Sequence, residues 1–227
     1  MALRKPTSGL ILPMRIWDLP TRLFHWVLVL LIIGSYVTIK ANMLTLHVLC
    51  GETILVLVLW RLVWGLVGSD TARFSQFIRS PFAAIRHLLH FARREPDTQI
   101  GHNEAGGWVV LGLLALLLAQ IGTGLFGRND DDFVEGPLAK LIAGPLSEKL
   151  MSLHSVIFDA IMIVVLLHVI AIIAYAVVKR HDLVRPMFTG KKRLPAATPA
   201  PRMASPVLAT AIMVVAAVAV WLMVTRV

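Results

Sequence analysis

One long apolar stretch, residues 153–178, limits what this chain can fold into, because it can cross a bilayer yet carries two histidines. His154 and His168 are 14 positions apart, nearly four turns of an α-helix. Both imidazoles therefore project from about the same face, separated by roughly 21 Å along the axis. A polar ring in hydrocarbon is costly and by default marks a functional site. We expect two stacked cofactor sites, one toward each side of a membrane.

The composition is that of a polytopic membrane protein, with 227 residues of which 57% are hydrophobic and a mean hydropathy of +0.77. The net charge of +9 would suit nucleic acid, but the basic residues flank apolar runs and are better explained as topology signals. We expect no nucleic-acid partner. The single cysteine, Cys50, excludes a four-thiolate iron–sulfur cluster, an intrachain disulfide and a covalent C-x-x-C-H haem site.

Five apolar runs are long enough to span a bilayer, at about 20 residues each. Lysine and arginine outside these runs divide sixteen to five between alternate sides, which predicts a cytoplasmic N-terminus and a C-terminus outside. The amino-terminal segment lacks the cleavage site of a signal peptide, so we expect the first run to be kept as a span in a bacterial inner membrane. The runs are residues 22–40, 45–67, 107–127, 152–178 and 205–225.

The loop of residues 68–106 is predicted to contain an amphipathic helix at about 81–94, lying on the lipid of the inner leaflet. Its histidines, His87 and His90, are expected to be surface residues. His102, in the run GHNEAGG, is expected to have a loop or helix-start role rather than to bind metal.

The remaining segments divide the chain. Residues 1–190 are expected to form the membrane domain, residues 191–204 a proline- and alanine-rich linker with little capacity to pack, and residues 205–227 an appended helix for partner contact or anchoring. The run of residues 107–127 carries glycines that favour close helix packing, with room for a flat macrocycle as the alternative. These glycines are Gly112, Gly122 and Gly124.

Four histidines can be compared by depth once the topology is assigned. His47 and His154 each lie near the outer end of their helices, whereas His25 and His168 lie on the inner side. The expected pairs are therefore His47 with His154 and His25 with His168. Counted from the helix ends, the inner two differ in depth by roughly 10 Å, which tilt or an extended fourth helix would have to remove.

Two opposed histidines suit a haem better than other cofactors. Zinc needs three or four protein ligands, and a proton path would favour carboxylates, of which the spans offer Glu52 and Asp159. Haem iron already has four equatorial nitrogens and needs two axial ligands. Arg61 lies at the level of His168 and is expected to pair with a haem propionate, with snorkelling as the alternative. Gly51, one turn after His47, would let the outer macrocycle approach the backbone.

Several runs resemble the bacterial cytochrome b561 family, which includes the b-type cytochrome subunits of nickel–iron hydrogenases. These runs are RIWDLPTRLFHW, LHVLCGETILVLVLWRLVWG and GHNEAGGW, together with the paired histidines of the fourth span, and the similarity covers about residues 14–190. The resemblance implies an all-α integral membrane protein, a four-helix bundle that binds two b-type haems through His25, His47, His154 and His168. The fifth helix departs from the simplest pattern of the family.

We expect such a protein to carry electrons between the quinone pool and a partner, either a periplasmic c-type cytochrome or a dehydrogenase or hydrogenase subunit. Two alternatives remain. The chain can be the membrane anchor of a larger oxidoreductase with no substrate reaction of its own, or, less in keeping with the pattern, a metal-ion transporter lined by histidines.

Overall fold

The structure of the protein, a computed structural model, describes residues 10–78, 80–90, 97–130 and 134–226. Helix α6 continues into a π-helical turn, Tyr175–Lys179, so that the fourth span covers Gly144–Lys179. The prediction of an all-α integral membrane protein with five spans is confirmed. The five helices long and apolar enough to cross a membrane are α1 (Leu19–Lys40), α2 (Leu44–Val67), α5 (Glu104–Phe126), α6 (Gly144–Ala174) and α8 (Pro206–Thr225).

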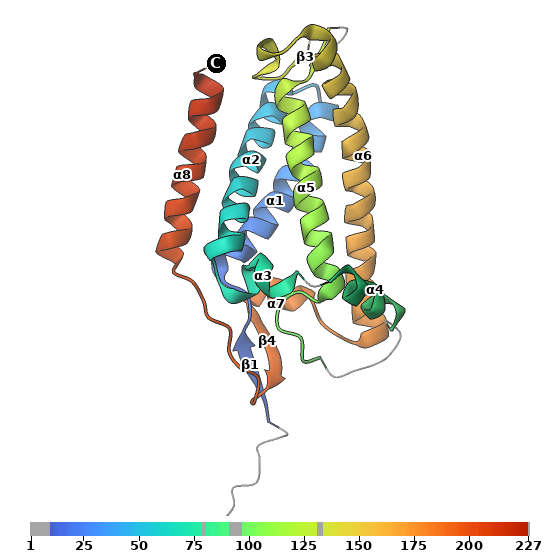
Figure 1. The fold of residues 1–227 in the computed structure, drawn as a ribbon, viewed down its shortest axis with the longest axis vertical. Coiled ribbons are helices and arrows are strands. Elements are labelled where there is room, and N and C mark those ends of the chain that lie inside the picture. The colour runs from blue at the N-terminus through green and yellow to red at the C-terminus, as the bar shows by residue number, and fades with distance from the viewer. Residues whose placement is uncertain (1–9, 79, 91–96, 131–133, 227) are drawn as a thin grey trace, which may run out of the picture.

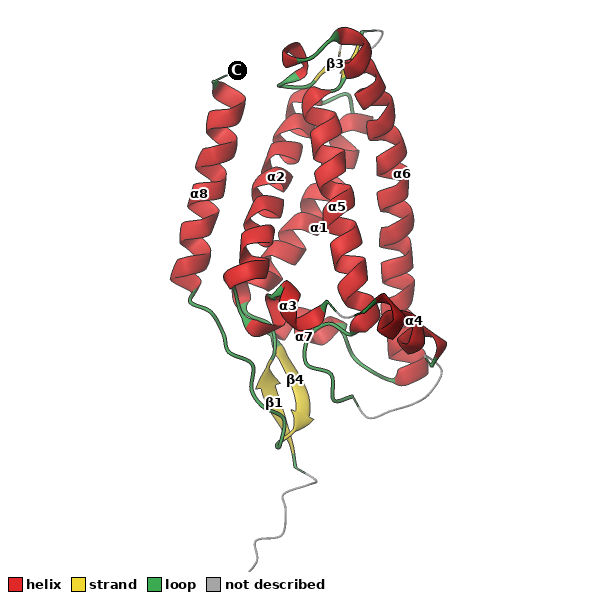
Figure 2. Ribbon diagram, in the orientation of Figure 1, coloured by secondary structure: helices red, strands yellow, loops and turns green. Residues whose placement is uncertain are grey.

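Helices α1, α2, α5 and α6 form a bundle, with α1 packed on α2 and α5 packed on both α2 and α6 (Figure 1). Helix α8 lies outside this bundle and packs mainly on α2. We call the end of the bundle at which α1 begins the hairpin end, because it carries β1 (Ile11–Arg15) and β4 (Lys191–Pro195). The opposite end, with β2 (Arg128–Asn129) and β3 (Val134–Glu135), is the loop end. Both two-stranded sheets thus lie at the ends of the helices (Figure 2).

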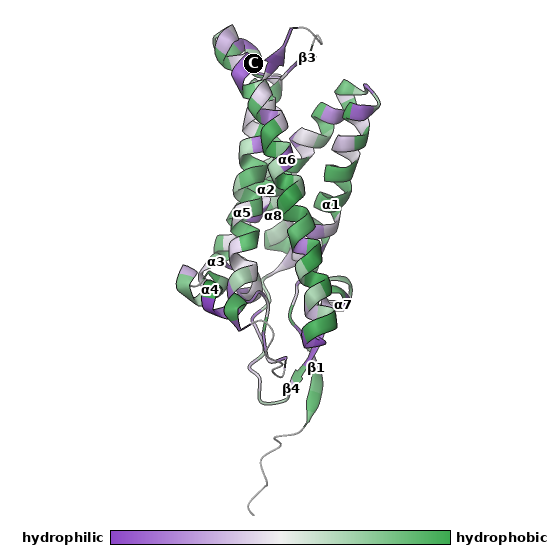
Figure 3. Ribbon diagram, turned by 90° about the vertical axis from the view of Figure 1, so that its right-hand side faces the viewer, coloured by the Kyte–Doolittle hydropathy of each residue, from purple (hydrophilic) through white to green (hydrophobic). Residues whose placement is uncertain are grey.

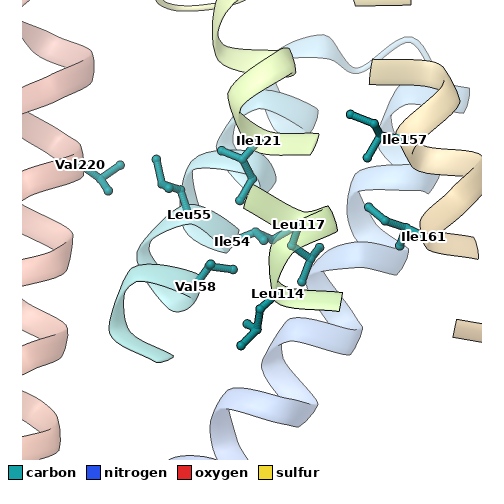
Figure 4. Close-up of a cluster of buried hydrophobic side chains, with 9 residues drawn as sticks. All are labelled: Ile54, Leu55, Val58, Leu114, Leu117, Ile121, Ile157, Ile161 and Val220. Atoms are coloured by element: carbon teal, nitrogen blue, oxygen red, sulfur yellow. The ribbon is translucent and has the colours of Figure 1, made fainter. Parts of the chain in front are cut away.

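The core runs along the middle of the bundle, between α2, α5 and α6, with one contribution from α8 (Figure 4). The long helices are apolar along most of their length and polar residues gather toward the two ends, as expected of a protein surrounded by lipid (Figure 3). The buried residues of this core are Ile54, Leu55, Val58, Leu114, Leu117, Ile121, Ile157, Ile161 and Val220.

The start of α1 is fixed by a side-chain cap. The Asp18 carboxylate accepts a hydrogen bond from the Thr21 amide at 2.6 Å, and Pro20 occupies the first turn, where its missing N–H costs nothing. The same carboxylate accepts from the Trp64 indole at 3.3 Å. The beginning of α1 is therefore attached to the end of α2.

Residues 191–204 differ from the expected unpacked linker. Strand β4 takes up their first five positions and pairs antiparallel with β1, and Leu194 is fully buried between the pair and the bundle. Further along, the Ala204 amide donates to the Ser69 hydroxyl at 2.9 Å. Composition indicated a flexible segment, but a strand at the other end of the sequence supplies the backbone partners that composition cannot reveal.

The loop after α2 contains two short helices, α3 (Phe74–Phe77) and α4 (Pro81–Leu89). Helix α4 is shorter than the predicted 81–94, and residues 91–96 lie outside the described residues. It packs on α5 at the hairpin end and exposes apolar side chains, as a helix lying on lipid would. These exposed side chains are Phe82, Ile85, Leu88 and Leu89.

Candidate cofactor sites

At the loop end, the imidazoles of His47 and His154 face each other across the bundle. Their ring centroids are 6.2 Å apart and their planes lie at 79°. His47 is on the first turn of α2 and His154 on the third turn of α6, so two helices distant in sequence bring them to one level. Two imidazole nitrogens bound at roughly 2 Å on opposite sides of one metal ion would put the ring centroids about 6 Å apart. The separation is thus that of two axial ligands.

Each ring is oriented by a backbone carbonyl. The Nδ1 atom of His47 lies 2.9 Å from the Ser35 carbonyl oxygen, and that of His154 lies 2.9 Å from the Gln120 carbonyl oxygen. Since a carbonyl only accepts, both bonds assign the proton to Nδ1 and leave the Nε2 lone pair free for a metal. Histidines that ligate metals usually donate their other ring nitrogen in this manner.

A cavity of about 600 Å³ opens around these two rings, between α1, α2, α5 and α6. Such a volume lies in the range of pockets that hold cofactors. Gly51 lines the cavity, and a Cβ built on it would meet nothing within 4 Å. Lys40, Glu52, Glu135 and Asp159 also line it, so one cation and three carboxylates belong to this site.

The three glycines singled out in α5 differ in their surroundings. A Cβ built on Gly112 or Gly122 would meet nothing within 4 Å, so these two do not serve close helix packing. At Gly124, a Cβ would lie 2.8 Å from Cε1 of His154. The absent side chain at this position lets the imidazole of α6 approach α5 closely.

Toward the hairpin end, His25 on α1 and His168 on α6 are close enough for the charge of one to act on the other. Arg61 on α2 and His102, just before α5, belong to the same group, because the charges of His25, Arg61 and His168 all act on His102. The two expected inner histidines therefore share one end of the bundle, as their predicted pairing requires.

Three buried nitrogens of this inner group have no hydrogen-bond partner among the described residues. They are Nδ1 of His25, a terminal guanidinium nitrogen of Arg61, and Nδ1 of His102. Buried polar atoms are nearly always paired, so three unpaired ones together indicate room for a group that would supply the acceptors. The carboxylates of a haem propionate would satisfy such donors.

Arg61 is 2% exposed and its guanidinium carbon lies 5.0 Å from the centroid of the Phe74 ring. The Asp18 carboxylate is near enough to interact with its charge. The side chain thus stays inside the bundle. The snorkelling alternative requires the guanidinium to reach the surface, and it does not.

His102 is the residue at this site that sequence reasoning missed. Its ring packs against Trp17 and Phe77, with centroids 4.8 Å and 4.6 Å away. Burial lowers its pKa to about 3, and the charges of Arg61 and His168 add to this effect. The imidazole is therefore neutral. The only signal in the sequence was its position next to Asn103, whose carboxamide oxygen caps α5 by accepting from the Gly106 amide at 2.7 Å.

His87 also differs from expectation. It was predicted to be a surface residue, but it is partly buried and bonded to side chains of two other helices, whereas His90 is exposed as predicted. The sequence pattern of α4 could not show that its polar side meets the ends of α5 and α6.

Neither pair of histidines has a third protein ligand of the kind that a bare metal ion needs among the described residues. Within residues 10–78, 80–90, 97–130 and 134–226, no three histidine, cysteine or carboxylate side chains come together to hold a metal ion. Two ligands a site is too few for zinc, but it is what haem iron needs.

The model of one family, prokaryotic cytochrome b561, matches residues 16–190 of the chain. The chain belongs to this family. A curated relative, the probable Ni/Fe-hydrogenase B-type cytochrome subunit of Bradyrhizobium diazoefficiens, is 21% identical to this cytochrome over 212 residues, which cover 78% of this chain and 85% of the relative. No solved structure gives a significant match.

As a member of the family, the protein is a multi-pass membrane cytochrome that binds b-type haem and takes part in transmembrane electron transfer. The resemblance noted in the sequence is confirmed. The match ends at residue 190, so the fifth span lies beyond the region shared with the family.

Proposed function

We propose that this cytochrome carries electrons across the membrane through two b-type haems, one held by His47 and His154 and the other by His25 and His168. The observation that carries the proposal is the loop-end pair: two imidazoles 6.2 Å apart, each fixed by a carbonyl, beside a cavity of about 600 Å³. The 14-residue spacing on α6 puts the second site roughly 21 Å away along the helix axis.

A haem with two histidine ligands supplies a one-electron carrier without an open coordination position. The residues of the chain determine how it is bound. Ser35 and Gln120 hold the outer imidazoles through their carbonyls, and Gly124 leaves room for one of them. In the inner site, the unpaired guanidinium nitrogen of Arg61 would bind propionate, and the positive charge of Arg61 would favour the reduced state.

We assign the hairpin end to the cytoplasm because sixteen lysines and arginines of the sequence precede, join or follow the apolar runs on that side, against five on the other side. The inner site then faces the cytoplasm and the outer site the periplasm of a bacterial inner membrane. We propose that quinone exchanges electrons with the protein, and that a redox protein, either a c-type cytochrome or an oxidoreductase subunit, is the partner.

The experiment is to purify the full-length protein in detergent and measure its haem content and redox spectra. We expect two haems for each chain, two midpoint potentials, and reduction by quinol. His168→Ala should lose the inner haem and keep the outer one. A haem-to-protein ratio well below two in the wild type, or retention of both haems by the variant, would contradict the assignment.

The name of the Bradyrhizobium relative favours a second candidate function, in which the chain anchors a larger oxidoreductase such as a hydrogenase and has no substrate reaction of its own. Purification from mild detergent tests this directly. The anchor function would be supported if a metalloenzyme co-purifies with the cytochrome and if quinol does not react with the haems in its absence. Quinol oxidation by the isolated cytochrome would contradict it. A protein without any reducible haem would instead favour the histidine-lined transporter.

A further inference from the structure

Two hydrogen bonds and one ion-pair contact join three helices at the hairpin end. The Tyr175 hydroxyl, at the start of the π-helical turn after α6, lies 2.5 Å from Nε2 of His87 on α4. Nδ1 of the same imidazole lies 3.2 Å from a carboxylate oxygen of Glu104 on α5. Asn103 donates from its side-chain nitrogen to the Tyr175 hydroxyl at 2.6 Å. None of these side chains belongs to the two histidine pairs.

The helix cap sets the direction of these bonds. The side-chain oxygen of Asn103 is occupied by the Gly106 amide, so its nitrogen must be the atom that donates to Tyr175. The tyrosine, having accepted there, donates its own proton to Nε2 of His87, so the ring proton of His87 lies on Nδ1, the nitrogen that faces the Glu104 carboxylate. Every group in the series Tyr175, His87, Glu104 can both take up and release a proton.

The inner end of this series lies on the histidine-bearing face of the fourth span. His154 lies fourteen residues before His168, and Tyr175 lies seven residues after His168. The three residues therefore occupy about the same face of the helix. Tyr175 is buried, at 9% exposed. It lies roughly 10 Å beyond His168 along the axis, between the level of the inner histidines and the end of the span that we assign to the cytoplasm.

The Glu104 end of the series is exposed to water. The Glu104 side chain is 35% exposed, against 22% for His87. Glu104 also lines a second hollow of about 530 Å³ at the hairpin end, together with His102 and Gln99. Exposure thus increases along the series from Tyr175 to Glu104, as required of a path between the interior of the bundle and the aqueous phase.

We propose that Tyr175, His87 and Glu104 form a proton relay between the cytoplasm and quinone reacting at the inner cofactor site. The inference rests on the proposed function. Oxidation of one quinol releases two electrons and two protons. The electrons leave through the inner site one at a time. For each proton, Tyr175 gives its hydroxyl proton to Nε2 of His87 as it takes one from the quinol hydroxyl, and His87 gives its Nδ1 proton to the Glu104 carboxylate, which releases it to water. A turn of the imidazole ring then presents a protonated nitrogen to Glu104 and an unprotonated one to Tyr175 before the second proton passes. Reduction of quinone runs these steps in reverse.

Other charged groups surround the relay without interrupting it. The Lys179 ammonium lies 5.8 Å from the centroid of the Tyr175 ring, and the His181 ring is 6.4 Å from it. His181 is 3.9 Å from Asp97, which also binds Lys192 at 2.6 Å. On α4, Arg86 precedes His87 and its side chain is exposed.

The test compares quinol with a reductant that needs no proton transfer. Full-length protein with both haems is reconstituted in vesicles, and the rate of haem reduction is measured with a soluble quinol and with dithionite. Tyr175→Phe and His87→Gln should slow reduction by quinol by about tenfold or more, within the contribution of positioned acid–base groups, and leave reduction by dithionite unchanged. His90→Gln is the matched control, because His90 directly follows the same helix and, among the described residues, its ring bonds to the Arg86 carbonyl oxygen, 2.8 Å away.

Two further measurements distinguish a proton relay from a purely structural network. In His87→Gly, added imidazole should restore the rate with quinol. In infrared difference spectra taken during quinol oxidation, the wild type should show protonation of a carboxyl group, and Glu104→Gln should lack this band. Glu104→Gln keeps an acceptor for the histidine N–H, so it serves if the other variants do not fold.

The outcomes separate the relay from the proposed function. Variants that react with quinol as fast as His90→Gln would overturn the relay and leave the function intact. A wild type that holds both haems but does not react with quinol would overturn the role of quinone, and the relay with it. Slow reduction of the variants by dithionite as well would mean damaged cofactor sites, and would also count against a specific relay.

Discussion

A single absent side chain decides where His154 can lie. Because a Cβ at Gly124 would come within 2.8 Å of the imidazole, Gly124→Ala must push the ring out of its place against the Gln120 carbonyl. We expect the outer haem to be lost or its spectrum altered, the inner haem to remain, and the protein to lose about 1–3 kcal/mol of stability from overpacking. Haem content and redox spectra measure the first two effects, and thermal unfolding the third.

The control for this substitution is on the same helix. A Cβ at Gly122 has open space around it, so Gly122→Ala should keep both haems. Equal behaviour of the two variants would mean that the position of His154 does not depend on this close approach.

Arg61 tests the inner site through its charge. Reduction adds an electron to a haem, so removal of a buried positive charge should make reduction harder. Arg61→Ala is expected to lower the midpoint potential of the inner haem by tens of millivolts, where about 59 mV is a tenfold change for one electron, or to reduce its occupancy. Arg185→Ala, an exposed arginine at the same end, should leave both potentials alone. An unchanged inner haem in Arg61→Ala would exclude the propionate role.

Single functional residues could be predicted from the sequence where a polar side chain interrupts an apolar run. The four histidines and Arg61 were identified because polar groups in apolar runs are costly. The roles of Ser35 and Gln120 could not be predicted, since they act through main-chain carbonyls that every residue has. His102 lay outside the apolar runs, and only the fold brings it beside Arg61.

At the scale of elements, α8 is bound to the bundle by few specific contacts. The Trp60 indole donates to the Ala209 carbonyl at 2.9 Å, and Val220 joins the core. No residue of α8 lines the 600 Å³ cavity. We expect a chain ending at Ala204 to keep both haems but to unfold at a lower temperature. Haem content and thermal unfolding in detergent are the measurements, and loss of haem from the shortened chain would contradict the prediction.

A double-mutant comparison isolates the indole bond. Trp60→Phe removes the donor and should cost about 1 kcal/mol in the full-length protein, and less in the shortened chain, where the acceptor is already absent. Equal costs in both backgrounds would show that Trp60 stabilises the bundle independently of α8.

The long helices were predictable to within a few residues in most cases, because an apolar run of bilayer length has few alternatives. The fourth helix began eight residues earlier than expected, at Gly144, because its first turns lie beyond the apolar run. The strands β1 and β4 were not predicted. Each has five residues, and a partner some 180 residues away along the chain leaves no local signal.

For the whole molecule, the distribution of charge predicts which end faces the cytoplasm. Reporter enzymes that are active only in the periplasm, fused after residue 130 or at the C-terminus, should be active, and a fusion after residue 90 should be inactive. The reverse pattern would invert the proposed orientation, and with it the side from which the relay takes its protons.

The region shared with the family, residues 16–190, begins directly after β1 and ends directly before β4. Adjacent strands are about 4.8 Å apart, so the two ends of the cytochrome unit meet. Such a unit is closed on itself: joining its ends by a short loop and opening the chain elsewhere, between α1 and α2 for instance, would give a circular permutant with the same helix contacts. The fifth span then becomes an independent module that can be exchanged without rebuilding the electron path.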